Sequence, residues 1–446
     1  MSLARFERIA NALRNSPVLL LSVAAFLSFA MWFYADRAWA PPAEMHFSDL
    51  YPRWYGSREL LIHRRDPYSL AVTRDIQIGM HGHAREIPPQ RKDYAQKPQE
   101  EDRFAYPVYV AFVLAPTIGF PFATVERIFR IILPLVAAAT ALLWMRALHW
   151  QVSRPARTAL VLLTLGSFPV LECIYLQQPA LLAGLFLAGS AAALTRGYLS
   201  AAGVLLALAT IKPQLVALFV LWLLVWAISD LRRRMPFLLG FVIAMAVLLG
   251  SSELLLPGWL REFLQGLISY QHYTGNESIL SLWLTHRGAL IVTVALLMAL
   301  AFAGWKFRSA SADSARFMFA SCLVLTTTLV VIPTMYPTGQ ILLVPAVFWL
   351  LQNGSEIFGS RAQKLSSFGA LSIIVWPWIG ALVFMLLSIF ISRNSMRAHW
   401  LIPVSTLLIT PMMVLIALAI RAPDVLKVEG AKLAMGTQEA VALGSK

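Results

Sequence analysis

Charge and cysteine are both scarce in this sequence. Only 13% of the 446 residues are Asp, Glu, Lys or Arg, 58% are hydrophobic, and two are cysteines. Disordered chains have few hydrophobic residues, and disulfide scaffolds depend on many cysteines. The composition therefore excludes a disordered chain, a disulfide scaffold and a secreted enzyme. Cys173 and Cys322 lie within or beside apolar runs, and we interpret both as small core residues.

Charged residues are also rare over long stretches of the chain. The runs 131–145, 199–226 and 371–391 carry almost no charge, and the mean hydropathy of the chain is +0.67. Helices that are apolar on every side suit a membrane and not a soluble core. The predicted fold class is an all-α polytopic membrane protein. Basic loops on one side of a membrane explain the net charge of +14 better than nucleic-acid binding does.

The positions of the basic residues predict how the chain crosses the membrane. Placing them on the cytoplasmic side gives about 12 transmembrane helices plus one re-entrant or interfacial segment broken by prolines, with both termini in the cytoplasm. The first apolar run, 18–35, precedes Ala38-Trp39-Ala40 and so resembles a signal peptide. Its length and the following Pro41 and Pro42 favour a retained helix.

Six regions follow from this topology. They are 1–35 (cytoplasmic N-terminus and first helix), 36–103 (a large extracytoplasmic loop), 104–122 (the re-entrant or interfacial segment), 123–353 (a transmembrane core with the outer loop 257–287), 354–421 (C-terminal helices) and 422–446 (a cytoplasmic tail).

The usual signatures of nucleotide-dependent, zinc-dependent and serine-dependent enzymes are missing. The chain has no zinc-type ligand spacing, Walker loop, G-x-S-x-G elbow or GxGxxG turn. Any chemistry must rest on carboxylates, cations and amides. We therefore expect no cofactor, with a divalent metal left open.

An acidic residue stands out just after the first apolar run. Asp49 lies among Phe47, Tyr51, Trp54 and Tyr55, where aromatic rings suit sugar faces and a partly desolvated carboxylate makes a better general base. The alternative is an interfacial aromatic belt with an ordinary surface acid, which is at least as compatible with the composition.

Other candidates fall on the same predicted face of the membrane. Lys212 interrupts an apolar run beside Pro213, where a buried ammonium needs an anion. A lipid phosphate would serve, but a snorkelling lysine or a pair with Glu172 is the alternative. For Gln177 and Gln178, binding of substrate hydroxyl groups and capping of a helix end are equally compatible with the sequence. His272, in the polar and aromatic stretch 270–278, suits a sugar or phosphate subsite, although such a histidine is more often merely exposed.

Several short motifs occur in a characteristic order. They are Asp49 with Tyr55, Leu60-Leu61, Asp66-Pro67-Tyr68, Phe104-Ala105-Tyr106-Pro107, Ala115-Pro116, Gln178, 203–213, and Asn276-Glu277-Ser278 with Arg287. In this order they resemble glycosyltransferase family 87 of the GT-C superfamily, integral membrane enzymes that use polyprenyl-phosphate sugars. The family's G-Q-x-N element reads Gln177-Gln178-Pro179-Ala180 here, its Y-P-P reads Tyr106-Pro107-Val108, and Gly339-Gln340 stands near its Y-D element.

The resemblance implies an inverting transferase in a bacterial-type cytoplasmic (inner) membrane. It would move a single mannose-like hexose or arabinofuranose from a polyprenyl-phosphate donor to an acceptor glycan or glycolipid on the extracytoplasmic face, with Asp49 as the general base. We expect Lys212, Arg53 and Arg58 to bind the donor phosphate. The residues expected to bind sugar or acceptor are Tyr55, Asp66, Tyr68, Gln177, Gln178, His272, Asn276, Tyr336 and Gln340.

Two alternatives belong to other functional classes. A membrane transporter or lipid flippase would use the helix breaks at Pro213 and Pro116 as a gated path, but it also predicts inverted repeats, and none is visible in the hydropathy order. A membrane scaffold without activity would leave Asp49 paired and remote from any cavity.

Overall fold

The computed structural model describes residues 16–39, 48–84, 102–274, 278–333, 337–353 and 360–425, with only the backbone described in 269–274. Over these ranges the chain folds into helices and turns, without a strand. The predicted all-α architecture is confirmed.

The helices follow one another with short connections. In chain order they are α2 (Pro17–Tyr34), η1 (Ala35–Trp39), α3 (Leu50–His63), α4 (Leu70–His81), α5 (Val110–Leu114), η2 (Ala115–Thr117), α6 (Phe122–Ala147), α7 (Arg154–Leu165), α8 (Phe168–Tyr175), α9 (Ala180–Leu194), α10 (Leu199–Ala209), α11 (Pro213–Ile228), α12 (Leu231–Leu255), α13 (Trp259–Thr274), η3 (Ile279–Leu282), α14 (His286–Phe307), α15 (Ala315–Val331), η4 (Pro337–Leu343), α16 (Val344–Gln352), α17 (Arg361–Leu387), α18 (Arg393–Ala398), α19 (Leu401–Val404), η6 (Ser405–Leu408) and a last helix over 410–425.

Six helical stretches in the described ranges are long and apolar enough to cross a membrane. They are Pro17–Trp39, Phe122–Ala147, Leu231–Leu255, His286–Phe307, Arg361–Leu387 and Arg393–Val425. The pair α7 and α8, bent by 55°, adds a seventh if it is one broken span, and five shorter apolar helices complete the set. The chain is thus a polytopic integral membrane protein.

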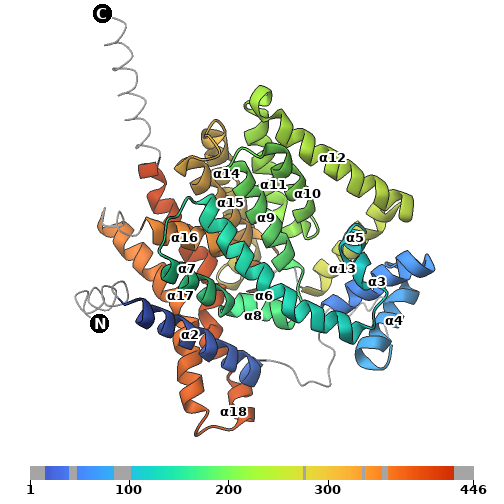
Figure 1. Ribbon diagram of the computed structural model, residues 1–446, viewed down its shortest axis with the longest axis horizontal. Helices are drawn as coiled ribbons and strands as arrows, with labels where there is room; N and C mark the ends of the chain where they lie inside the picture. Colours follow the sequence, from blue (N-terminus) through green and yellow to red (C-terminus); the bar gives the residue numbers. More distant parts are fainter. Residues whose placement is uncertain are drawn as a thin grey trace, which may run out of the picture.

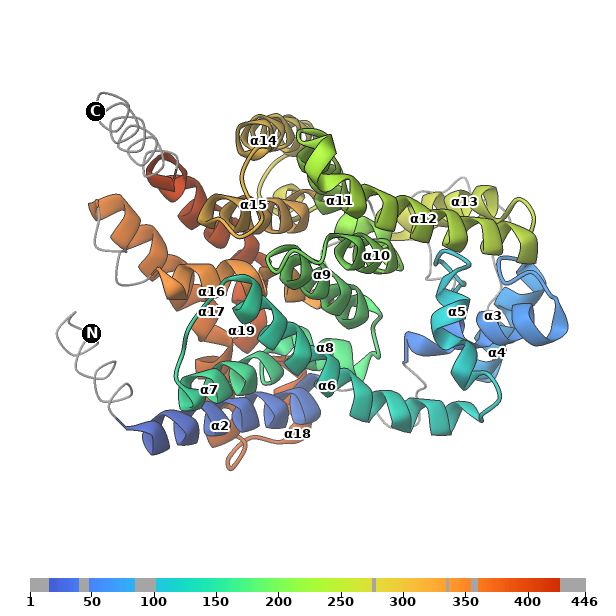
Figure 2. The same ribbon diagram turned by 45° about the horizontal axis from the view of Figure 1, so that its top comes forward.

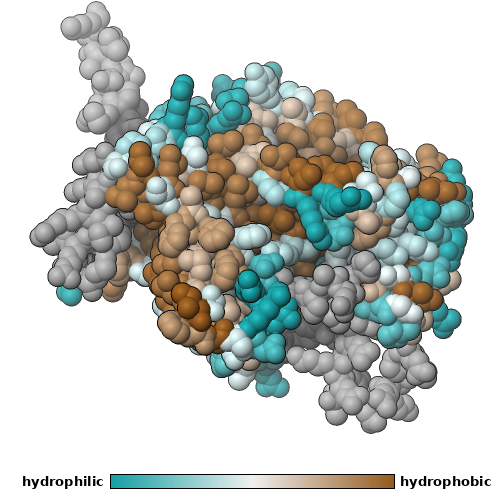
Figure 3. Space-filling view, turned by 60° about the horizontal axis from the view of Figure 1, so that its bottom comes forward, coloured by the Kyte–Doolittle hydropathy of each residue, from teal (hydrophilic) through white to brown (hydrophobic). Residues whose placement is uncertain are grey.

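The surface has the character expected of such a protein. Large apolar side chains are exposed on and beside several long helices, among them Leu254 on α12 at 87% and Phe390, just after α17, at 85% exposure. Figure 3 shows one face on which broad apolar areas surround smaller polar ones. Water would make this exposure costly, and lipid removes the cost.

The segment 104–122 does not form a spanning helix. Pro107, Pro116 and Pro121 each remove a backbone donor, and only α5 and η2 form between them. Figures 1 and 2 show α5 beside α3, at the opposite end of the molecule from α17. This end of the molecule contains the residues of the candidate site.

Two glycines allow α10 and α12 to approach closely. A Cβ atom on Gly203 would collide with the backbone oxygen of Phe237, and one on Gly240 would collide with the backbone oxygen of Ser200. Small residues at such crossings let helix backbones pack directly in a membrane. This contact fixes α10, and with it the turn that leads to Lys212.

We expect Gly203→Val to destabilise the protein by about 1–3 kcal/mol, because the valine must push two backbones apart. Thermal unfolding in detergent measures the effect. Gly250→Val on α12 is the matched control, since a Cβ at Gly250 meets no atom within 4 Å. Equal melting temperatures for the two variants would contradict this account of the packing.

Candidate functional site

The site is built around the turn that ends α8. Gln177 adopts a left-handed backbone conformation with φ of 52°, which few residues other than glycine adopt. The turn is closed by the Gln178 N–H, which donates to the Cys173 carbonyl at 2.8 Å, in the pattern of a helix C-cap. Gln177 and Gln178 are 2% and 8% exposed, so both amides need partners within the protein.

Gln177 joins three parts of the chain. Its side-chain oxygen accepts a hydrogen bond from the Ser48 hydroxyl, and its side-chain nitrogen donates to the Glu126 carbonyl of α6 at 2.8 Å. The backbone N–H of Asp49 also donates to the Leu176 carbonyl at the end of α8, at 2.9 Å. These bonds hold Asp49, at the start of α3, against the end of α8.

Gln178 connects the acid to the lysine. Its side-chain nitrogen donates to Asp49 Oδ2, and its side-chain oxygen accepts from Lys212 Nζ at 3.0 Å. Arg53 Nη1 lies 3.8 Å from Asp49 Oδ1. A carboxylate, a neutral amide and an ammonium group therefore form one chain of contacts, with a guanidinium on the far side of the carboxylate.

Lys212 is positioned by the break between α10 and α11. The Tyr109 hydroxyl contacts the Thr210 carbonyl and Oγ1 atoms at 3.0 and 3.1 Å, and Pro213 starts the next helix. Lys212 is only 8% exposed, so its ammonium has given up most of its water. Tyr109 carries no signal in the sequence beyond its place in the broken segment 104–122.

Glu172 is a second carboxyl group near the site. It lies on α8, is 6% exposed, and its Oε2 atom has no hydrogen-bond partner among the described residues. It stands within electrostatic reach of both Asp49 and Lys212. From the sequence, Glu172 is considered only as an alternative partner for Lys212. In the structure Glu172 and Lys212 do not form a direct ion pair.

The electrostatics favour a basic carboxylate. Asp49 keeps 29% of its side-chain surface open, yet burial by the surrounding protein raises its pKa above the ordinary value, while Arg53 and Lys212 act in the opposite direction and Asp102 adds to the rise. A raised pKa makes the ionised form a stronger proton acceptor.

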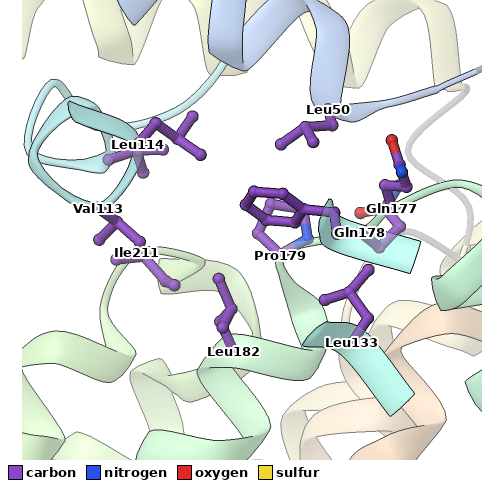
Figure 4. Close-up of a pocket in the computed structure, with 11 residues that line it drawn as sticks. Leu50, Val113, Leu114, Leu133, Gln177, Gln178, Pro179, Leu182 and Ile211 are labelled. Carbon is purple, nitrogen blue, oxygen red and sulfur yellow. The ribbon is translucent and has the colours of Figure 1, made fainter. Parts of the chain in front are cut away.

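An apolar crevice of about 10 Å³ meets the two glutamines. It is lined by side chains from α5, α6 and α9, with Leu50 and Ile211 beside them (Figure 4). Ile211 immediately precedes Lys212. The crevice thus meets Gln178, whose side-chain oxygen accepts from Lys212.

Several other predicted site residues make contacts of their own. Arg58 lies over the Trp54 ring at 5.7 Å, and Tyr55 stacks on Tyr51. Asp66 accepts the Tyr68 N–H within its own turn, and the Tyr68 hydroxyl donates to the Tyr106 carbonyl at 2.6 Å.

Gln340 is bonded to the C-terminal part of the chain. Its side-chain nitrogen donates to the Leu407 carbonyl at 2.8 Å. Asn276, Tyr336 and the side chain of His272 lie outside the described residues.

No group of three or more His, Cys, Asp or Glu residues that would suit a metal ion occurs in the described ranges. The cations near Asp49 are those of the chain's own Lys212 and Arg53. The arrangement can orient an anion and accept a proton from a neighbouring hydroxyl.

The family model of glycosyltransferase family 87 matches residues 104–333, which is half of the chain. The chain belongs to this family. The predicted family is thereby confirmed, and the protein is an integral membrane glycosyltransferase. The matched range contains Gln177, Gln178 and Lys212, whereas Asp49 precedes it. No curated protein and no solved structure matches the chain.

Proposed function

We propose that this glycosyltransferase moves one sugar from a polyprenyl-phosphate donor to the hydroxyl of an acceptor glycan or glycolipid, with inversion at the anomeric carbon. A mannose-like hexose or arabinofuranose is the proposed sugar. The observation that carries the proposal is the chain Asp49–Gln178–Lys212, in which a base and a phosphate-binding cation are held one amide apart.

The surroundings of Lys212 support a lipid phosphate as the leaving group. The ammonium has three N–H donors, one of which reaches Gln178, so the others suit phosphate oxygens. Apolar residues line the adjoining crevice, so the surroundings of the ammonium suit a lipid-linked phosphate. A nucleotide would need polar partners for its base and ribose.

The proposed reaction needs one proton acceptor. Asp49 takes the proton of the acceptor hydroxyl, the hydroxyl oxygen bonds to the anomeric carbon, and the bond from that carbon to the phosphate oxygen breaks. The polyprenyl phosphate leaves with the bonding electrons, and Lys212 and Arg53 stabilise its growing charge. A phosphate is already a good leaving group, so no general acid is required.

The same proposal places the site on the extracytoplasmic face of the cytoplasmic membrane. There a lipid-linked donor is suitable, because nucleotide sugars are absent outside the cytoplasm.

Replacing Asp49 tests the proposed base. Asp49→Asn keeps the shape of the side chain and removes its basicity, so transfer should fall by a factor of about 10² or more while donor binding persists. Transfer of radiolabel from polyprenyl-phosphate sugars to a membrane extract measures it. Asp66→Asn is the matched control and should have a smaller effect, because Asp66 holds a local turn. Near-normal turnover in Asp49→Asn would reject the mechanism and favour a transporter.

The pH profile tests the state of the base. Only ionised Asp49 accepts a proton, so kcat/KM should rise with pH and fall as pH drops through the pKa of Asp49. Because burial raises that pKa, the half-point should lie above the ordinary aspartate value of about 3.9. Arg53→Met removes a charge that lowers the pKa, and it should move the half-point to higher pH. A shift to lower pH would contradict the assignment.

Replacing Lys212 tests phosphate binding. Lys212→Gln removes a charge-assisted contact at a nearly dry position, and the donor KM should rise about 10- to 100-fold. Steady-state kinetics at several donor concentrations separate this effect from a change in kcat. Lys306→Gln on α14 is the control, since Lys306 is exposed. An unchanged donor KM would leave Lys212 with a structural role.

Cysteine labelling tests the orientation. Cysteines introduced at 95 and 275 should react with an impermeant maleimide added outside intact cells, and those at 151, 233 and 310 should not. Both native cysteines are buried and give little background. Labelling at 151 without labelling at 95 would place the site on the other face.

A further inference from the structure

Helix α13 lies between two of the membrane-spanning helices and is itself neither long nor apolar enough to cross a membrane. It follows α12, which ends at Leu255, after the three residues 256–258, and α14 begins at His286. Three residues extend at most about 10 Å, so α13 begins at the level where α12 leaves the bilayer. Figures 1 and 2 show α13 at the end of the molecule that contains α3 and α5.

One side of α13 packs against the protein beside the candidate site. Trp259 and Phe263, one turn apart, are 3% and 7% exposed. The Trp259 ring meets the Tyr109 ring edge-on, with 6.0 Å between their centroids. The Tyr109 hydroxyl in turn contacts Thr210, two residues before Lys212. The buried side of α13 thus touches the structure that positions Lys212.

A second side of α13 is apolar and exposed. Leu260, Leu264 and Ile268 follow one another at intervals of four residues, which places them in one stripe along the helix. They are 50%, 50% and 56% exposed. With 3.6 residues per turn, this apolar stripe borders the side that carries Trp259 and Phe263. Apolar surface therefore continues from the protein core to the outside of the helix.

The third side of α13 is polar. Arg261, Glu262 and Gln265 are all exposed, and Glu262 lies within electrostatic reach of Tyr68 in the turn before α4. The order around the helix axis is therefore a buried side, an exposed apolar stripe and an exposed polar side. A helix in the surface of a membrane, at the edge of a protein, needs these three sides for protein, lipid and water.

Lipid is the partner that this position selects. Leu254, in the last turn of α12, is 87% exposed just before the chain turns into α13. Trp283 is 63% exposed two residues before Thr285, the N-cap of α14, and tryptophan concentrates at the boundary between membrane and water. The apolar stripe lies between these two positions in the chain. A soluble partner would have to reach the stripe at a level that lipid already occupies.

We propose that α13 lies in the surface of the bilayer, with the apolar stripe among the acyl chains just below the headgroups. This contact steadies Trp259 against Tyr109 and so holds Lys212 near the level of the headgroups. The lipid contact is independent of the reaction. The hold on Lys212 rests on the proposed function, in which Lys212 binds the phosphate of a lipid, and it places Lys212 at the depth where lipid phosphates reside.

Fluorescence quenching tests the lipid contact without depending on activity. The full chain is reconstituted in phosphatidylcholine vesicles, with the fluorophore NBD attached to Leu264→Cys or to the matched control Gln265→Cys on the polar side. The native cysteines are buried. Phosphatidylcholine with a nitroxide near the headgroup end of one acyl chain should quench the label at 264 about threefold more than the label at 265. Iodide in the buffer should give the reverse order. Ile268→Cys repeats the measurement one turn later.

The depth of the nitroxide distinguishes a surface helix from a spanning one. A surface helix reaches only about 5–10 Å into the boundary, so a nitroxide near the methyl end of the acyl chain should quench the label at 264 less than one near the headgroup. Stronger quenching from the methyl end would make α13 part of a span. Equal quenching of both labels by iodide would put the apolar stripe in water, where it would fit a protein partner. Either result would overturn the proposal.

A second arm tests the hold on Lys212. Leu264→Glu places a charge among the acyl chains, so the donor KM for a radiolabelled polyprenyl-phosphate sugar should rise about tenfold. Gln265→Glu adds the same charge on the polar side and should leave the donor KM unchanged. Leu264→Asn replaces the glutamate variant if the latter does not fold.

The two arms fail in different ways. An unchanged donor KM in the Leu264 variant would refute the hold on Lys212. Absence of transfer in wild type, with the quenching pattern intact, would instead refute the proposed function and with it the role at Lys212, while the lipid contact of α13 would stand.

Discussion

The arrangement of the site depends on the side-chain amide of Gln178, whose nitrogen and oxygen atoms are both hydrogen-bonded. Gln178 donates to Asp49 and accepts from Lys212, and without this amide the buried ammonium of Lys212 would lose its hydrogen bond. Three further features position the residues that meet at this amide. They are the left-handed turn at Gln177, the hydrogen bond from the Asp49 N–H to the Leu176 carbonyl, and the contact of the Tyr109 hydroxyl with Thr210.

The fold was predictable because lipid imposes simple rules. A run without charge must satisfy its backbone internally, so each run became a helix. The same rules located the break at Lys212-Pro213 and the irregular segment 104–122. Asp49, Gln178 and Lys212 each stood out as a polar residue beside apolar sequence. Their contacts join residues 129 and 34 positions apart, and no local pattern encodes such pairings.

The rest of the site depends on side-chain orientations that the sequence does not specify. Gln340 lies in the short 3-10 helix η4, and its amide donates to the Leu407 carbonyl, 67 positions further along the chain. Glu172 lies within an apolar run and reaches the site only because α8 is short and ends beside Asp49. Gln177 adopts a left-handed backbone although it is not glycine, and its side chain ties Ser48 to α6.

The neutral spacer has a chemical consequence for the proposed reaction. A lysine in direct contact with Asp49 would lower the pKa of the carboxyl group and use the donors needed by phosphate. With the amide between them, Lys212 lowers the pKa of Asp49 only from a distance. Burial remains the larger influence on the pKa of Asp49. The ammonium keeps N–H groups for an incoming anion, and the carboxylate keeps Oδ1 beside Arg53 for an incoming hydroxyl. One glutamine can thus preserve both the basicity of the acid and the anion affinity of the lysine within a few ångströms.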